Sequence, residues 1–187
     1  VSFVDFCANL WLVHLVETWW WVPQTAVAWV PWDPWLAAAQ LLAYTVFSEI
    51  WYDCAHRLLH AVPWLYRHVH AARHARAHLV ALDALTAHPA EHMLVDVGSA
   101  VGGVALLAHA GVPQCWAGVQ LWVAVATWSA CAAHSGMRAV ETWPGLGMCR
   151  AHYIHHHQPC VNFGRGLFLL DRVHNTLCFA HEPVQET

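Results

Sequence analysis

The chain has 187 residues, is 58% hydrophobic and is only 11% charged, whereas a soluble domain averages about 25% charged residues. A globular surface needs charge to stay in solution, so this composition argues against a soluble protein and favours one embedded in a membrane. With a net charge of −4, the chain lacks the excess of basic residues that binds nucleic acid, which excludes a nucleic-acid partner. The length fits one domain, residues 1–187, and the first residue, Val1, is compatible with a truncated N-terminus.

Four apolar stretches are candidate transmembrane helices. In chain order they cover about residues 1–21, 34–55, 92–110 and 114–133. The first is interrupted by charged residues and a histidine, which leaves a peripheral or partly buried helix as the alternative there. Six tryptophans around the turn between the first two stretches fit an interfacial aromatic belt: Trp19, Trp20, Trp21, Trp29, Trp32 and Trp35.

The polar parts of the chain are residues 57–91 and 136–187, which together hold every basic residue other than histidine, all of them Arg. The positive-inside rule therefore places both parts on the cytoplasmic side. A tight turn over 109–114 joins the last two apolar stretches. We predict an all-α integral-membrane bundle of about four transmembrane helices, arranged as two hairpins, with a cytoplasmic His-rich helical cap.

Histidine is the most informative residue type, because the chain has 17 of them and thirteen fall in or beside five groups near the predicted cytoplasmic helix ends. Spacings of three or four place imidazoles on one helix face, as metal ligands require. The groups are His56 and His60; His68, His70, His74 and His78; His88 and His92; His134; and His152, His155, His156 and His157. Interfacial histidines without a metal are the alternative.

The number of histidines bears on the number of metal ions. One zinc ion takes about four ligands, so eight or more converging imidazoles suit two metals. Neutral imidazole binds Fe, Zn, Cu or Ni. An all-histidine site beside lipid, with few carboxylates, favours iron and oxygen chemistry, and composition leaves zinc and copper open.

In these motifs the chain resembles the fatty acid hydroxylase / sterol desaturase superfamily of membrane histidine-box oxygenases. The resemblance covers about residues 47–176. The matching motifs, in the family's order and at its distances, are HRLLH at 56–60, HAARH at 70–74, AHPAE at 87–91, HSG at 134–136, HYIHH at 152–156, NFG at 162–164 and DR at 171–172.

The resemblance implies an O2-dependent di-iron oxygenase that hydroxylates or desaturates a membrane lipid, with a slight leaning toward sterol-like over fatty acyl substrates. It implies two iron ions, with zinc as a substitute, and an external electron donor such as cytochrome b5 or a ferredoxin-type protein. The implied metal ligands are His56, His60, His70, His74, His88, His92, His134, His152, His155 and His156. For His88 and His92, a supporting or helix-capping role is the alternative.

The chain departs from the family pattern at two motif positions. Arg73 stands where the second box usually has a histidine, and a guanidinium cannot bind a cation. His68 or His78 is the expected substitute, or one metal is held weakly. Tyr153 replaces a common acidic residue of the last box, which removes a partner that could orient a ligand. Glu91 and Asp171 are expected to orient ligand imidazoles or to form ion pairs.

Two other functions compete with a lipid oxygenase. Arg73 motivates a catalytically impaired, metal-binding membrane relative with a non-enzymatic role. A zinc or copper transporter is the third hypothesis, although few polar residues lie in the apolar stretches to form a path. We expect a multi-pass membrane protein, located in the endoplasmic reticulum of a eukaryote or the inner membrane of a bacterium. Its His-rich face is expected on the cytoplasmic side.

Overall fold

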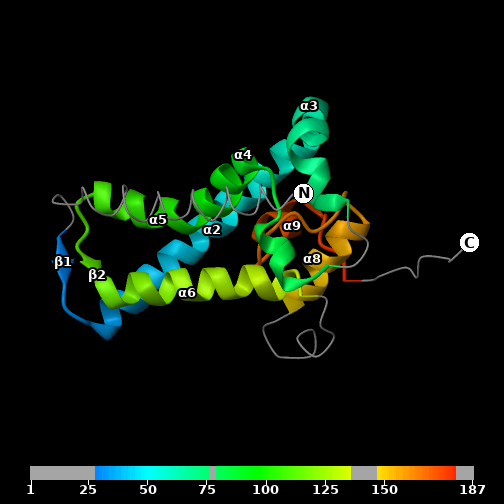
Figure 1. Ribbon diagram of the computed structural model, residues 1–187. Coiled ribbons are helices and arrows are strands. Elements are labelled where there is room, and N and C mark those ends of the chain that lie inside the picture. Colours follow the sequence, from blue (N-terminus) through cyan, green and yellow to red (C-terminus); the bar gives the residue numbers. More distant parts are fainter. Residues whose placement is uncertain (1–27, 76–78, 136–146, 180–187) are drawn as a thin grey trace, which may run out of the picture.

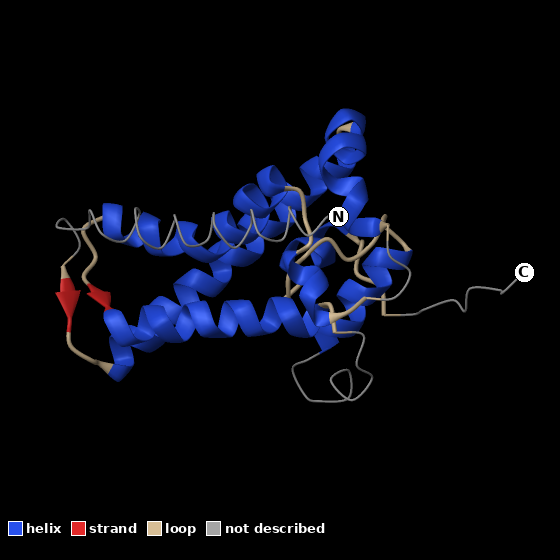
Figure 2. Cartoon of the chain, in the orientation of Figure 1, coloured by secondary structure: helices blue, strands red, loops and turns tan. Residues whose placement is uncertain are grey.

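The structure is a computed structural model that describes residues 28–75, 79–135 and 147–179 (Figure 2). The described part is almost entirely helical, with one pair of two-residue strands, as the all-α prediction requires. The first predicted apolar stretch, residues 1–21, lies outside the described residues, as does His78.

Helices of three kinds follow one another along the chain. Elements η2 and η5 are π-helical, and η3 and η4 are 3₁₀ helices. In chain order the elements are β1 (Trp29–Val30), α2 (Pro34–Ala61), α3 (Pro63–Leu65), η2 (Tyr66–His70), η3 (Ala71–His74), η4 (Ala81–Leu85), α4 (Pro89–Glu91), η5 (His92–Val97), α5 (Gly98–His109), β2 (Gln114–Cys115), α6 (Trp116–Ala133), α8 (Gly147–His157) and α9 (Leu169–His174).

Helices α2, α5 and α6 form an elongated bundle, with the strands at one end and α8 and α9 at the other (Figure 1). The strands pair in parallel, with Trp29 opposite Gln114. Gln40 on α2 links this end to the helices, because its side chain donates to the Pro113 carbonyl (2.6 Å) and accepts from the Cys115 backbone N–H (3.1 Å).

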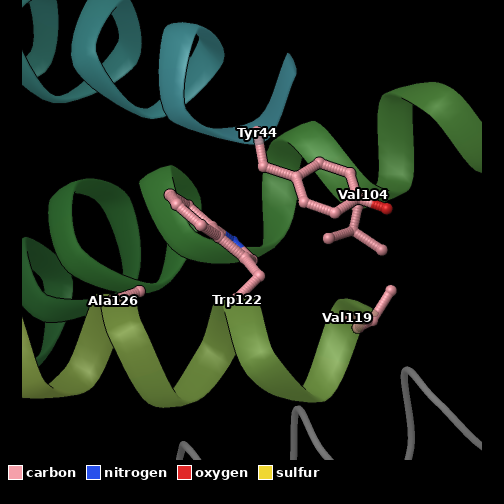
Figure 3. Close-up of a cluster of buried hydrophobic side chains, with 5 residues drawn as sticks. All are labelled: Tyr44, Val104, Val119, Trp122 and Ala126. Atoms are coloured by element: carbon pink, nitrogen blue, oxygen red, sulfur yellow. The ribbon is translucent and has the colours of Figure 1, made fainter. Parts of the chain in front are cut away.

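The centre of the bundle is a small apolar core between α2, α5 and α6 (Figure 3). The Tyr44 ring lies 5.9 Å from the Trp122 ring, and the Tyr44 hydroxyl donates to the Gln114 side chain. The Trp122 indole N–H donates to the Ala100 carbonyl (2.7 Å), so both large rings bury their apolar surface with their polar atoms satisfied. The buried residues of this core are Tyr44, Val104, Val119, Trp122 and Ala126.

Two described stretches are long and apolar enough to cross a membrane: Pro89–His109, which runs through α4, η5 and α5, and Trp116–Ala133. They correspond to the third and fourth predicted segments. The last segment starts two residues later than predicted, because Gln114 and Cys115 form β2. The second predicted segment is helical and continues to Ala61, but its polar residues keep it out of this group. Of the four predicted spans, two are therefore borne out as candidates.

The loop before α9 reaches into the helical bundle through Arg165. Its guanidinium donates to the hydroxyls of Ser48 on α2 (3.3 Å) and Ser99 on α5 (2.7 Å) and to the Ala126 carbonyl on α6 (2.7 Å). One side chain thus ties three helices to the segment that follows the last histidine box.

Candidate metal centre

Eight histidines come together in two clusters at the end of the bundle away from the strands. Within each cluster, one ring nitrogen of every member lies within 4.8 Å of those of the others. The first cluster contains His56, His60, His70, His74 and His155, and the second contains His134, His152 and His156. The clusters adjoin, because the rings of His74 and His156 are 4.8 Å apart.

Helical spacing explains how each motif reaches the clusters. His56 and His60 are one turn apart on α2, and His152 and His156 are one turn apart on α8. His155 lies between the last two in sequence and faces the first cluster, so α8 supplies both clusters. The π-helix η2 brings in His70; π-helical turns are frequent at functional sites.

Backbone carbonyls and one carboxylate fix the tautomers of three rings of the first cluster. The Nδ1 of His56 lies 2.9 Å from the Phe163 carbonyl, and that of His155 lies 2.7 Å from the Val161 carbonyl. A carbonyl oxygen only accepts, so each Nδ1 carries the proton and each Nε2 presents a lone pair. His70 obtains the same tautomer from Glu91, 2.9 Å from its Nδ1.

These lone pairs point at one another. The Nε2 atoms of His56 and His70 are 3.2 Å apart, although neither carries a proton to donate. Those of His60 and His74 lie 2.9 Å and 3.0 Å from the His70 Nε2. The contact of His56 with His70 joins two acceptors, and it is repulsive unless a cation lies between them. Nitrogens bound at about 2.0–2.1 Å to one metal stand about 3 Å apart, so the first cluster fits a metal ion.

The second cluster repeats this geometry with fewer members. The Nε2 atoms of His152 and His134 are 3.0 Å apart, and those of His156 and His152 are 3.2 Å apart. The Nδ1 of His134 donates to the Ala130 carbonyl at 2.8 Å, which leaves its Nε2 free to bind a metal.

Burial keeps these imidazoles neutral. It lowers the pKa of His60 and His70 to about 3 and that of His74 and His134 to about 4. Burial likewise lowers the pKa of the other four, and neighbouring imidazoles add to the effect. A neutral ring is the form that binds a metal, so little proton competition is expected at neutral pH.

Two predicted ligands lie outside both clusters. His88 is exposed and caps α4, where its Nδ1 accepts the Ala90 backbone N–H at 3.2 Å. His92 is buried, and its Nδ1 donates to Asp96 at 3.1 Å. His88 therefore has the helix-capping role that the sequence offered as its alternative. A ligand role for His88 or His92 stays a prediction. His68, an expected substitute for the missing ligand, is exposed and stacks on Trp64.

Three features around the clusters were not anticipated from the sequence. The carbonyls of Val161 and Phe163 orient ligand rings, although NFG was interpreted only as a turn. Asp171 forms the expected ion pair, with Arg57 at 2.8 Å, but its second role, holding the loop that carries those carbonyls, was not anticipated. Arg165 ties that loop to the bundle. In the sequence, the NFG and DR motifs were the signal for these features. Many of their partners are backbone groups, which a pattern of side chains does not reveal.

The described geometry is that of a helical protein with a paired all-histidine site. The sequence profile of the fatty acid hydroxylase family matches residues 41–176, and the chain belongs to this family. The resemblance inferred from the histidine boxes is thereby confirmed.

Named relatives give a finer comparison. The chain is 29% identical over 119 residues to methylsterol monooxygenase 2-2 of Arabidopsis thaliana, covering 64% of this chain and 44% of the relative. It is 27% identical over 142 residues to methylsterol monooxygenase 1 of Rattus norvegicus, covering 74% and 46%. A very-long-chain aldehyde decarbonylase of Oryza sativa subsp. indica is 38% identical over 64 residues, covering 34% and 24%. The matches thus span less than half of each relative, and no solved structure matches the chain.

Proposed function

We propose that the protein is a membrane-bound di-iron oxygenase that hydroxylates or desaturates a lipid, with a sterol-like or fatty acyl substrate. The observation that best supports this proposal is the convergence of eight histidines. Within them, the Nε2 atoms of His56 and His70 face each other at 3.2 Å. Relatives named as methylsterol monooxygenases and an aldehyde decarbonylase support the lipid substrate and favour an enzyme over an impaired relative.

The surface of the bundle supports a location in the membrane. On α2 the usual pattern is inverted, since Gln40, Ser48, Glu49 and Asp53 are buried whereas Leu42, Val46 and Ile50 are exposed. Only 28% and 33% of the two candidate spans are buried inside the protein, which leaves most of their apolar surface for lipid. Polar groups inside and apolar groups outside are the arrangement that a bilayer favours. We infer that the histidine-bearing end faces the cytoplasm, because arginines of the described residues, such as Arg57 and Arg73, lie there.

Iron bound in both clusters would supply the activation of O2 that breaks an unreactive C–H bond, and an external donor such as cytochrome b5 or a ferredoxin-type protein would supply electrons. Zinc is a possible substitute for iron. The chain holds the ligand rings neutral, and the carbonyls of Val161 and Phe163 keep the Nε2 atoms of His155 and His56 available to a metal in the first cluster. Burial of the rings excludes bulk water from the reacting centre.

A cavity of about 600 Å³ provides an approach to the first cluster. It opens at the surface, and its mostly apolar walls include His60, Tyr66, Pro159 and Phe163. A lipid chain fits such walls, and His60 is itself a member of the first cluster. We therefore assign this cavity to the reacting part of the substrate.

The test is metal analysis of the purified protein, followed by mass spectrometry of lipid products formed with O2 and a competent reductase. We expect bound iron and an oxygen-dependent product. His155→Ala removes a ring that is buried and lies in the first cluster, and should weaken iron binding in that cluster and reduce product. The exposed His68→Ala is the matched control and should change neither. Protein that binds no iron and forms no product would refute the proposal.

A further inference from the structure

Arg73 occupies the middle of the second histidine box, between two members of the first cluster, His70 and His74. Its side chain is only 3% exposed and does not turn toward solvent. Its Nη1 donates to Glu91 at 3.1 Å and to Asp96 at 3.0 Å. Two carboxylates, the buried Glu91 and the half-buried Asp96, therefore hold the guanidinium in place.

Position 73 lies at the boundary between the two clusters. The next residue, His74, belongs to the first cluster, and its ring lies 4.8 Å from that of His156 in the second cluster. A histidine at this position would add an imidazole beside that cluster, whereas a guanidinium has no lone pair to offer.

The two clusters consequently differ in their supply of ligands. The first has five imidazoles, which is enough to satisfy one metal without water. The second has three, a number typical of sites that leave a coordination position open. The expected substitute His68 is turned away onto Trp64, and no further histidine, cysteine or carboxylate of the described residues joins the second cluster.

We propose that the two metal sites are unequal: the five-histidine site fills first, and the three-histidine site holds its metal more weakly because Arg73 replaces an imidazole. This inference rests on the proposed metal centre. It predicts protein that retains one tightly bound metal through purification and exchanges the other. It also predicts that the second metal must be supplied from the medium for both sites to be full.

The experiment titrates Co²⁺ into metal-free full-length protein in lipid nanodiscs, reading cobalt absorption, with the bound metal counted by mass spectrometry and affinities set by chelator competition. We expect two phases, the second at least about tenfold weaker. Arg73→His should strengthen the second phase about tenfold or more and leave the first unchanged. Arg67→His, which adds an imidazole at an exposed site on neighbouring η2, is the matched control and should change neither phase.

Arg73→Gln separates ligand number from charge, because it removes the positive charge without adding an imidazole. We expect it to strengthen the second phase much less than Arg73→His does. Two equal affinities in the unaltered protein would overturn the inference while leaving the metal centre standing, and so would a Gln variant that matches the His variant. Failure to bind any Co²⁺ would overturn the metal centre itself. The titration of the unaltered protein decides whether the two sites differ in affinity even if the variants fail to fold.

Discussion

At the scale of single residues, Asp171 organises the loop beside the first cluster. Its carboxylate is fully buried and accepts the backbone N–H groups of Phe163 (3.0 Å) and Gly164 (2.7 Å). It also accepts from the guanidinium of Arg57 (2.8 Å) and the hydroxyl of Thr176 (2.6 Å). Four donors on one carboxylate fix the backbone of the NFG motif, so this motif serves the metal centre through its carbonyl groups.

Asp171→Asn tests that indirect role. Asparagine keeps the shape but loses the charge and replaces one acceptor oxygen by a donor, so the loop should shift and the Phe163 carbonyl should hold His56 less well. We expect the affinity of the first metal to fall about 10–100-fold, as for other changes to groups that orient metal ligands. Chelator competition measures this.

The adjacent Arg172 is exposed and supplies the control. Arg172→Gln should leave metal affinity unchanged, since its side chain has no described contact with the loop. An Asp171→Asn protein that binds its first metal as tightly as the unaltered protein would show that the carbonyls need no such support.

At the scale of elements, the close approach of helices α2 and α6 depends on small residues. A Cβ added at Gly118 on α6 would lie 3.3 Å from the Cβ of Ala37 on α2. Ala37 is itself only 1% exposed. Small residues at such crossings let helix backbones approach, and this packing positions His134 at the end of α6 against the rest of the site.

Gly118→Leu should therefore force α2 and α6 apart. We expect it to lower the free energy of unfolding by about 1–3 kcal/mol, the usual cost of overpacking. Thermal or denaturant unfolding in detergent, followed by circular dichroism, gives the value. Ala117→Leu adds a side chain of the same size one residue earlier, at an exposed position, and should change stability by no more than about 0.5 kcal/mol. Equal effects at the two positions would contradict the packing argument.

At the scale of the whole molecule, much of the exposed apolar surface lies on the long helices. Large apolar side chains project outward from the three long helices, and no membrane-sized apolar face would be stable in water. The 21 residues of Pro89–His109 rise about 30 Å, which matches the hydrocarbon core of a bilayer. The histidine clusters sit at one end of this bundle, where a soluble electron donor could approach them.

Leu121→Arg tests the proposed lipid contact, because Leu121 is 46% exposed within the α6 span. A charge at that depth costs about 2.5–3.5 kcal/mol on insertion scales, so we expect markedly less protein in the membrane fraction. Val173→Arg, at a residue that is 71% exposed on α9, places the same charge outside the candidate spans and should be tolerated. If both variants accumulate like the unaltered protein, the α6 surface does not face lipid.

The sequence by itself determined the family, the helical class and the eight histidines that meet. Local spacing explains this success: His56 and His60, or His152 and His156, share a helix face whatever the rest of the chain does. The same reasoning placed the helix start at Pro34 and the two candidate spans to within a few residues, because hydropathy is also a local property.

Only the tertiary structure decided how the boxes combine. It divided eight histidines into groups of five and three, sent His155 and His156 from one box to different clusters, and left His88 and His92 outside both. Contacts between residues far apart in sequence, such as that of His56 with the Phe163 carbonyl, set these outcomes. They depend on how helices pack and on backbone groups that every residue shares, which side-chain patterns along the chain do not record.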